Sequence, residues 1–341
     1  MANQKLVIAV CRENTDRKDV NDALRCALSV KKAVSENDNW DADILFIEPR
    51  HDTGKFEALK NSIVKQAPDC VFNLFEGFSY KPLLECEFAE MLETSGLPFT
   101  GSSSLALSLC LDKEKTKNLL EKNGLPVPRG IFVDKADNTG DIKIAYPVFI
   151  KPRSEDSSIG IDECSLVRNT EEMAVSIKNK LTDHPAGLVV EEFIPGKEYN
   201  VGYLNAEGRG ILGVSVTDFS KYGGYTPFMN YAAKWDTDSD EYMKIIPEVI
   251  DPSSLGHGFL EKINYMCSKV QEIFGCSGYF RIDLREREEE LYILDINPNP
   301  DINEDSGFMR QVYARGGTYG QTIKTIIKNA SSTRREKWIK I

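Results

Sequence analysis

The stretch that decides the fold lies near the C-terminus and reads LYILDINPNP, residues 291–300. It begins as an apolar strand, then places Asp295 and Asn297 two positions apart, and ends at two prolines. Because side chains alternate along a strand, residues two positions apart share one face of the sheet. A carboxylate and a carboxamide on one face indicate either a metal site or the polar start of a loop.

The segment GYFRIDL at 278–284 has a similar arrangement, since Arg281 and Asp283 share one face. The charged run REREEE at 285–290 lies between the two segments and predicts the solvated tip of a β-hairpin. If the two strands pair, a guanidinium, two carboxylates and a carboxamide gather on one surface. The other surface is apolar and is expected to pack on a helix. It would carry Phe280, Ile282, Leu284, Tyr292, Leu294 and Ile296.

Oxygen ligands of this kind suit Mg²⁺, which commonly binds one or two carboxylates together with substrate phosphates. A half-exposed antiparallel sheet with its polar residues outward produces the same alternation. From the two strands alone, both interpretations stay open.

Three other segments hold residues suited to contacting a nucleotide. Lys151 ends the apolar strand YPVFIKP, and the next loop, RSEDSSIG at 153–160, has backbone N–H groups that suit phosphate oxygens. Lys113 begins a helix, and VVEEFIPGKEYNV at 189–201 carries glutamates beside a turn. The GxxxxGK[ST] pattern of a Walker A loop is absent. Each segment alone is equally typical of an ordinary polar surface.

Composition limits the classes of function. With 341 residues and 41% hydrophobic content, the chain has room for two or three domains. A formal net charge of −11 disfavours nucleic-acid binding, and no apolar run approaches the roughly 20 residues of a membrane-spanning helix. Eight cysteines without a CxxC pair, and no recognisable signal sequence, predict a cytoplasmic protein with reduced thiols. Only three histidines occur, all in loop-like stretches, which disfavours a His-ligated metal or a Ser–His–Asp triad.

Residues 1 to about 105 alternate between strand-like and helix-like segments, beginning with the buried strand KLVIAVC at 5–11. This alternation predicts an α/β layer with an open sheet. The loop after the first strand has no GxGxxG, which argues against a dinucleotide-dependent dehydrogenase.

Taken together and in order, six segments resemble the ATP-grasp ligases, and most closely their D-alanine–D-alanine ligase-like branch. They are GLPFTGSSSLALSLCLDKEKTKNLLEKNGLPVP, YPVFIKPRSEDSSIG, VVEEFIPGKEYNV, YAAKW, GYFRIDL and LDINPNP. The resemblance implies a mixed α/β and α+β fold with a Rossmann-like N-terminal domain (1–112), a small central domain (113–198) and a C-terminal domain (199–341). ATP is expected between the last two domains, and a homodimer is favoured.

The resemblance also implies roles for individual residues. ATP is expected to contact Lys113, Lys151, Ser157, Ser158, Glu191, Glu198 and Lys234, with Glu191 at the adenine edge and Glu198 at the ribose. The expected catalytic residues are Arg281, which would stabilise an oxyanion, Lys234 and Ser157. The expected ligands of Mg²⁺, for which Mn²⁺ can substitute, are Asp283, Asp295 and Asn297. The family therefore favours the metal interpretation of 291–300.

The implied reaction joins a carboxylate to an amine. The carboxylate attacks the γ-phosphate of ATP to give an acyl phosphate, and the amine then displaces phosphate through a tetrahedral intermediate. Such chemistry depends on positioning, charge neutralisation and exclusion of water. We expect segments 153–160 and 218–235 to act as lids.

The expected substrate pocket departs from the D-alanine–D-alanine ligase pattern. Its candidate residues are Arg17, Glu76, Trp235, Asp301, Ser306 and Gly307. Arg17 lies near the position of a glutamate in relatives, Trp235 replaces a tyrosine and Asp301 replaces a glycine. Extra acid at Glu76, Asp301, Glu304 and Asp305 suggests a substrate with an additional amine, and Arg17 suggests an additional carboxylate. Ordinary surface charges are an equally good interpretation.

We therefore predict an ATP- and Mg²⁺-dependent ligase that joins an amino acid or small carboxylate to an amino acid, giving ADP and phosphate. One alternative is a true D-alanine–D-alanine ligase with an altered pocket, and the rewritten segment 299–308 argues against it. The other is a nucleotide-binding protein without ligase activity. Because such a protein has no need of an oxyanion arginine, Arg281 argues against this second alternative.

Overall fold

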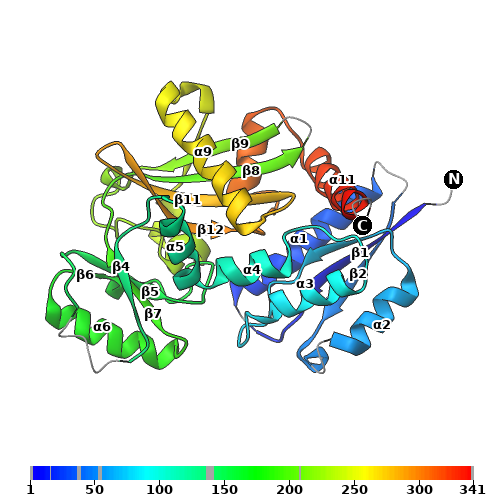
Figure 1. Ribbon diagram of the computed structural model, residues 1–341, viewed down its shortest axis with the longest axis horizontal. Coiled ribbons are helices and arrows are strands. Elements are labelled where there is room, and N and C mark those ends of the chain that lie inside the picture. The colour runs from blue at the N-terminus through cyan, green and yellow to red at the C-terminus, as the bar shows by residue number, and fades with distance from the viewer. Residues whose placement is uncertain are drawn as a thin grey trace.

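The computed structural model describes residues 3–338, apart from 16, 37–39, 53–55, 136–141 and 207–208. Three β-sheets follow one another along the chain, and helices cover them (Figure 1). The first sheet is parallel and the other two are antiparallel.

The N-terminal layer is built on a parallel sheet of order β2-β1-β3. Its elements are β1 (Gln4–Cys11), α1 (Lys18–Ser35), β2 (Trp40–Ile47), a 3₁₀ turn (Pro49–His51), α2 (Glu57–Gln66), β3 (Cys70–Leu74), α3 (Leu84–Thr94) and α4 (Ser104–Leu111). The central strand β1 is apolar on both faces and therefore needs helices on both sides. Leu6 and Val10 share a core with α1, whereas Ala9 and Cys11 share one with α2 and α3. The predicted α/β layer is confirmed.

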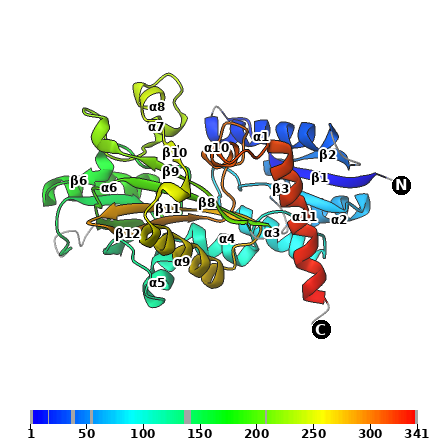
Figure 2. The same cartoon turned by 90° about the horizontal axis from the view of Figure 1, so that it is seen from above.

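The last helix, α11 (Tyr319–Trp338), returns to this first sheet (Figure 2). Its residues Ile323 and Ile326 belong to the same hydrophobic cluster as Leu6 of β1. The predicted domain boundaries at 112 and 198 stay predictions, but the end of the chain completes the core of the N-terminal layer.

The central sheet is antiparallel with the order β4-β7-β5-β6. Its elements are α5 (Lys113–Lys122), β4 (Gly130–Val133), β5 (Val148–Pro152), a 3₁₀ turn (Glu163–Ser165), β6 (Leu166–Val167), α6 (Thr170–Asp183) and β7 (Leu188–Glu192). Helix α6 covers one face of the sheet, where Met173 and Ile177 pack with Val148, Ile150 and Val190.

The C-terminal sheet is antiparallel with the order β10-β9-β8-β11-β12. Its strands are β8 (Glu198–Ala206), β9 (Arg209–Thr217), β10 (Glu248–Ile250), β11 (Tyr279–Arg287) and β12 (Glu290–Asn297). Its helices are α7 (Tyr231–Trp235), α8 (Asp240–Lys244), α9 (His257–Phe274) and α10 (Gly307–Ala314), with 3₁₀ turns at Phe219–Lys221 and Pro252–Ser254. Helix α9 lies on the apolar face of the hairpin, as expected, and places Met266 and Val270 in one core with Phe280 and Ile282.

The predicted hairpin turns at Glu288 and Glu289. Both residues have a positive φ, 52° and 66°, which gives a two-residue turn the twist of its flanking strands. Asp283 lies opposite Asp295, but the register shifts directly after this pair, so that Leu284 lies opposite Ile293. One additional residue therefore bulges from β12 at this point.

This bulge changes which side chains of β12 face the core. Leu291 and Ile293 join the apolar cluster with Ile296, whereas Tyr292 and Leu294 do not. The sequence-based assignment of Tyr292 and Leu294 to the apolar face was therefore wrong. Strict alternation cannot reveal a bulge, because one additional residue reverses the face of every side chain beyond it.

Two further observations concern the whole described chain. Among the residues that the structure describes, no helix is both long and apolar enough to cross a bilayer. All eight cysteines are free thiols, most of them buried.

Candidate active site

Two adjoining cavities lie along the polar face of the hairpin. The intersheet cavity, of about 140 Å³, lies between the central and C-terminal sheets, and the N-terminal cavity, of about 160 Å³, reaches the N-terminal layer. Lys234, Arg281 and Asn297 line both cavities, so the two spaces meet at these side chains. Every predicted nucleotide and metal residue lines the intersheet cavity: Lys113, Lys151, Ser157, Ser158, Glu191, Glu198, Lys234, Asp283, Asp295 and Asn297.

The hairpin brings Arg281 and Asp283 beside Asn297. Nε and Nη2 of Arg281 donate to the two carboxylate oxygens of Asp283 at 2.7 and 2.8 Å. The amides of Asn200 and Asn297 donate to the same carboxylate at 2.9 and 3.0 Å. Burial raises the pKa of Asp283, but Arg281 and the Asn200 amide outweigh burial and hold this pKa below its ordinary value. Asp283 is therefore an anion fixed in direction by three partners.

Asp295 lies opposite Asp283 in the strand register and contacts the start of helix α5. The ammonium of Lys113, which is only 5% exposed, lies 3.2 Å from Asp295 and 3.3 Å from Asp156. It also donates to the backbone carbonyl of Glu155 at 2.7 Å. Burial raises the pKa of Asp295, and Lys113 only partly offsets this effect. Lys113 thus joins the helix, the 153–160 loop and the hairpin.

The oxygen donors of the hairpin fit a hard divalent cation. Asp283 and Asp295 are register partners, and Asn297 follows on the same strand. No group of three or more His, Cys, Asp or Glu side chains in the described chain could hold a metal ion by itself. Two carboxylates and one amide suit an ion such as Mg²⁺, which takes its remaining ligands from water and substrate phosphates. The predicted metal residues are therefore brought together, and their role stays a prediction.

Glu191 forms a buried triad with two lysines. Its carboxylate lies 2.5 Å from the ammonium of Lys117 and 2.9 Å from that of Lys151. All three side chains are at most 7% exposed. Lys151 also donates to the carbonyl of Leu294 at 3.1 Å, which ties the central sheet to the hairpin. Lys117 was not predicted, although its position one helical turn after Lys113 is a signal that could have identified it.

Replacing Glu191 by glutamine is expected to destabilise the fold. The change leaves two buried ammonium groups without a counter-charge, which typically costs about 3–5 kcal/mol. Urea unfolding of the parent and of Glu191→Gln measures the difference. The control is Glu121→Gln, an exposed glutamate of α5, which should shift stability by less than about 0.5 kcal/mol. Equal stability of the two variants would contradict the triad.

The ion pairs of Glu191 also make the stability of the fold vary with pH in the acid range. Burial opposes ionisation of Glu191, but Lys117 and Lys151 outweigh it and lower the pKa. A lowered folded-state pKa adds stability that is fully present above the unfolded-state pKa of about 4.3 and is lost as the pH falls through the folded-state pKa. The stability difference between the parent and Glu191→Gln should therefore be constant near neutral pH and shrink below about pH 4. A difference that does not vary between neutral and strongly acid pH would argue against the ion pairs.

A buried guanidinium lies at the far end of the intersheet cavity. Arg285, 2% exposed, donates to the carbonyl of Ile194 at 2.8 Å and contacts Glu198 at 3.3 Å. The rings of Phe193 and Phe219 lie 5.1 and 4.8 Å from its guanidinium carbon. Glu198, the predicted ribose residue, is therefore partnered. Arg285 was not predicted, although it continues the alternation that begins at Arg281 and Asp283.

The two predicted lids contact each other. Ser157 and Ser158 have positive φ values of 56° and 62°, a conformation that costs energy for residues other than glycine and is common at functional sites. The Trp235 indole N–H donates to the Ser157 carbonyl at 2.9 Å, and the Ser158 hydroxyl donates to the Met229 carbonyl at 3.2 Å. The 153–160 loop is thus held by the segment that contains Trp235. Trp235 was predicted to contact the substrate. It lines the N-terminal cavity, but its indole N–H binds the loop.

Replacing Trp235 by phenylalanine is expected to loosen this contact. The variant keeps an aromatic ring but loses one hydrogen bond, worth about 1 kcal/mol, so kcat/KM for ATP should fall roughly 5-fold. Steady-state kinetics of Trp235→Phe measure the change. Trp40→Phe, on the edge strand β2, is the control and should retain the parent value. An unchanged kcat/KM in Trp235→Phe would argue against the lid contact.

Lys234 lies where the two cavities meet. It has no hydrogen bond or ion pair with the residues that the structure describes, and its Nζ lies 5.4 Å from the centre of the Trp235 ring. Burial lowers its pKa, and the nearby charge of Arg281 adds to this effect. Lys234 is half-buried, and a partly desolvated ammonium without a counter-charge is unfavourable. An anionic group in the cavity would supply the missing counter-charge.

The predicted substrate residues divide into two groups. Arg17, Glu76, Trp235 and Asp301 line the N-terminal cavity. Ser306 and Gly307 do not line either cavity. The Ser306 hydroxyl instead caps helix α10 by accepting a hydrogen bond from the backbone N–H of Met309. The same cavity is also lined by Asn73, Glu85 and Asn299, which were not predicted. Asn73 lies in β3, Glu85 lies in α3 and Asn299 follows β12.

Comparison with known proteins gives related enzymes. The family model described as D-ala D-ala ligase C-terminus matches residues 119–328. D-alanine--D-alanine ligase A of Bacillus cereus is 27% identical over 249 residues, which cover 72% of this chain and 76% of the relative. The D-alanine--D-alanine ligase of Syntrophotalea carbinolica is 29% identical over 241 residues, which cover 71% of this chain and 73% of the relative.

Solved structures agree with the fold. D-alanine--D-alanine ligase from Bacillus anthracis complexed with ATP is 18% identical, with a TM-score of 0.74 and coverage of 98% of this chain and 99% of that one. The VanG D-Ala:D-Ser ligase from Enterococcus faecalis is 19% identical, with a TM-score of 0.71 and coverage of 96% and 99%. The predicted fold class is thereby confirmed. Because the family model spans most of its length, the chain belongs to the D-Ala-D-Ala ligase family of ATP-grasp proteins.

Proposed function

We propose that this chain is an ATP-dependent carboxylate–amine ligase that forms ADP and phosphate. The observation that carries the proposal is the meeting of two cavities at Lys234 and Arg281. One cavity is lined by Lys113, Lys151 and Lys234 together with the hairpin carboxylates, and the other reaches acidic and amide side chains of the N-terminal layer. A ligase needs this arrangement, because its nucleotide and its two other substrates must meet at the transferred phosphoryl group.

Residues that line the intersheet cavity would have separate tasks in this reaction. Lys113 and Lys151 would bind phosphate oxygens, and Lys234 would approach the γ-phosphate from the other side. Arg281 would donate to the oxyanion of the tetrahedral intermediate, where donors fixed in advance are most effective. The Ser157–Trp235 contact would keep water from the acyl phosphate.

We further propose that the enzyme uses Mg²⁺. Asp283, Asp295 and Asn297 would hold the ion, which neutralises phosphate charge when it is bound. The proposal is supported by the paired register of the two carboxylates and by the absence of cysteine and histidine among the residues that line the intersheet cavity. We also propose a cytoplasmic enzyme, supported by the eight free thiols, and a homodimer stays a prediction.

The second candidate is a true D-alanine–D-alanine ligase, and the names of the relatives support it. The lining of the N-terminal cavity favours a different substrate pair. Asp301 places a carboxylate, and Arg17 a guanidinium, in a cavity that would otherwise receive two small amino acids. The substrates are therefore expected to carry more charge than alanine.

The test is phosphate release from ATP and Mg²⁺ in the presence of pooled L-amino acids, D-amino acids and small carboxylates. Active pools are resolved by mass spectrometry, and a product one water lighter than two pool members establishes the ligase and names its substrates. D-alanyl-D-alanine as the best product would favour the second candidate. ATP binding without phosphate release in any pool would contradict the proposed function.

A further inference from the structure

We propose that the N-terminal cavity binds a diamino acid, whose two ammonium groups lie against its two acidic walls, one formed by Asp22 and Asp301 and the other by Glu85. This inference rests on the proposed ligase function and names the substrate class of the same site. The substrate would be an α-amino acid with a second amine on its side chain.

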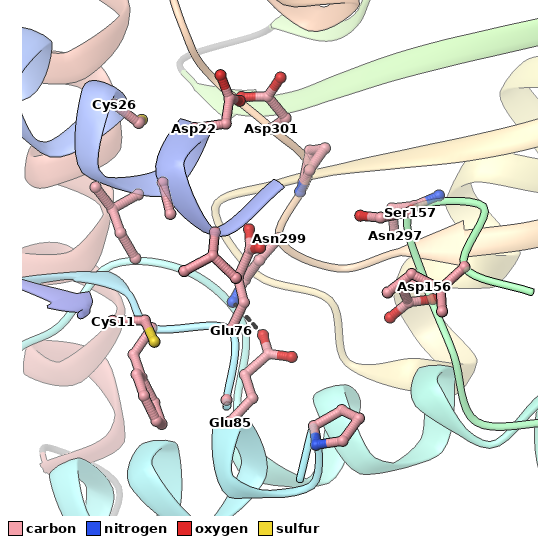
Figure 3. A pocket seen from close by; sticks show the side chains of 18 of the residues that line it. Cys11, Asp22, Cys26, Glu76, Glu85, Asp156, Ser157, Asn297, Asn299 and Asp301 are labelled. Carbon is pink, nitrogen blue, oxygen red and sulfur yellow. Dashed lines mark hydrogen bonds between the residues drawn. The ribbon is translucent and has the colours of Figure 1, made fainter. Parts of the chain in front are cut away.

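One acidic wall joins helix α1 to the segment after β12. Asp22 and Asp301 face each other there, as Figure 3 shows. The amide of Asn303 donates to both, at 2.6 Å to Asp22 and 3.0 Å to Asp301. Arg25 contacts Asp22 from outside the cavity at 2.6 Å. Asp301 forms no ion pair in the described part of the chain and accepts hydrogen bonds only from the backbone N–H and the side-chain amide of Asn303.

The second acidic wall is formed by helix α3 and the loop after β3. Glu85 accepts one hydrogen bond, from the Asn299 amide at 3.3 Å (Figure 3). Asn299 is itself held, since its oxygen accepts from the backbone N–H of Ser102 at 2.8 Å. Glu76 lies close by. Glu85 forms no ion pair with any residue that the structure describes, although it lines a cavity between protein layers.

Two buried amides supply an independent sign of a ligand. The side-chain Nδ2 of Asn73 and the Oδ1 of Asn303 have no hydrogen-bond partner among the described residues. Both residues are 2% exposed, and both line this cavity. Buried polar groups are normally satisfied, and an orphan costs about 1–3 kcal/mol. A donor and an acceptor that both lack partners suit a ligand that carries both carboxylate and ammonium groups.

Lys234 and Arg281 lie where this cavity meets the intersheet cavity. Asp22, on helix α1, and Asp301 form the wall on the side of the N-terminal layer. An amino acid would therefore direct its carboxylate towards the cations and its ammonium groups towards the acids. A simple zwitterion has no net charge and cannot balance both Glu85 and Asp301. A second ammonium group can.

The titration behaviour of the walls agrees with this geometry. Burial raises the pKa of Glu85, and the neighbouring Glu76 and Asp156 add to the rise. Burial also raises the pKa of Asp22, with Asp301 as the next cause. Mutual repulsion of this kind is relieved when a cation binds between the carboxylates.

The test compares amino acids with the same carbon chain that differ by one side-chain ammonium group. Lysine is compared with norleucine, and ornithine with norvaline, in both chiral forms, by phosphate release and product mass. The diamino acids are expected to show kcat/KM values at least about 100-fold above their neutral partners, because a site built for a polar group strongly rejects the analogue that lacks it. Equal or higher kcat/KM values for norleucine and norvaline overturn the inference while leaving the ligase intact.

A binding measurement separates this inference from the proposed function. Calorimetric titration of lysine and norleucine into the full chain, with Mg²⁺ and a non-hydrolysable ATP analogue, needs no turnover. Binding of lysine at least about 100-fold tighter than norleucine supports the cavity assignment even without catalysis. Similar affinities for both overturn it.

Two isosteric variants connect the preference to the acidic walls. Glu85→Gln and Asp301→Asn should each reduce the lysine-to-norleucine ratio at least about 10-fold, since each removes one charge from the site. Glu87→Gln is the matched control on the same helix, because Glu87 does not line the cavity. An unchanged ratio in both cavity variants overturns the inference.

Discussion

Asp295→Asn is expected to lower turnover about 10³-fold while the protein remains folded. Asp295 supplies one of the two carboxylates proposed for Mg²⁺ and lies 3.2 Å from the buried ammonium of Lys113. The asparagine keeps the size of the side chain but removes the charge that attracts the cation. Lys113 retains Asp156 as a partner, so the loss of stability should be modest. The measurement is phosphate release at several Mg²⁺ concentrations, with circular dichroism as the test of folding.

The matched control for Asp295→Asn is Glu290→Gln on the same strand. Glu290 is exposed, and its one ion pair among the described residues is with Lys262 at 3.5 Å, so its loss should leave turnover unchanged. The metal assignment predicts that Asp295→Asn also needs more Mg²⁺ for half-maximal rate. Parent-like turnover and Mg²⁺ dependence in Asp295→Asn would show that the assignment is wrong.

Arg281→Lys is expected to lower kcat about 10²- to 10³-fold with little change in ATP affinity. The guanidinium binds Asp283 through two nitrogens and still lines the region where the cavities meet. A lysine keeps the charge but cannot place two donors in this fixed geometry. The expected loss therefore lies in the transition state and not in binding of the nucleotide. Rapid-quench measurement of product formation, together with titration of an ATP analogue, separates the two effects.

Arg315→Lys is the matched control for Arg281→Lys. Arg315 is exposed, and its guanidinium donates to the backbone carbonyl of Ile211 at 3.1 Å, away from both cavities. The control should keep the parent kcat. A weakened affinity for the ATP analogue with an unchanged kcat in Arg281→Lys would assign Arg281 to nucleotide binding.

Several features of the site were predictable because they depend on short-range pattern. Alternation along two strands placed Arg281, Asp283, Asp295 and Asn297 on one face, and the structure pairs Asp283 with Asp295 in register. The apolar partners of these residues required a covering helix, which is α9. The order of strands and helices in the first 105 residues likewise indicated a parallel layer.

Other features depended on contacts between distant parts of the chain. The triad of Lys117, Lys151 and Glu191 joins a helix and two strands, and no spacing in the sequence links its members. The lid contact joins Trp235 to Ser157, which lies 78 positions earlier. Ser306 was expected at the substrate, but its local role as a helix cap places it outside both cavities.

By itself, the sequence determined the class of the protein, the polar face of the hairpin and the lysines that line the intersheet cavity. These depend on side-chain periodicity and on the order of motifs, which are local properties. The tertiary structure alone decided the bulge at Leu294, the return of α11 to the first sheet, and the balance of charges in the N-terminal cavity. The physical reason is that burial and ion pairing are set by which surfaces meet, and Asp22, Glu85 and Asp301 come together only when the layers pack.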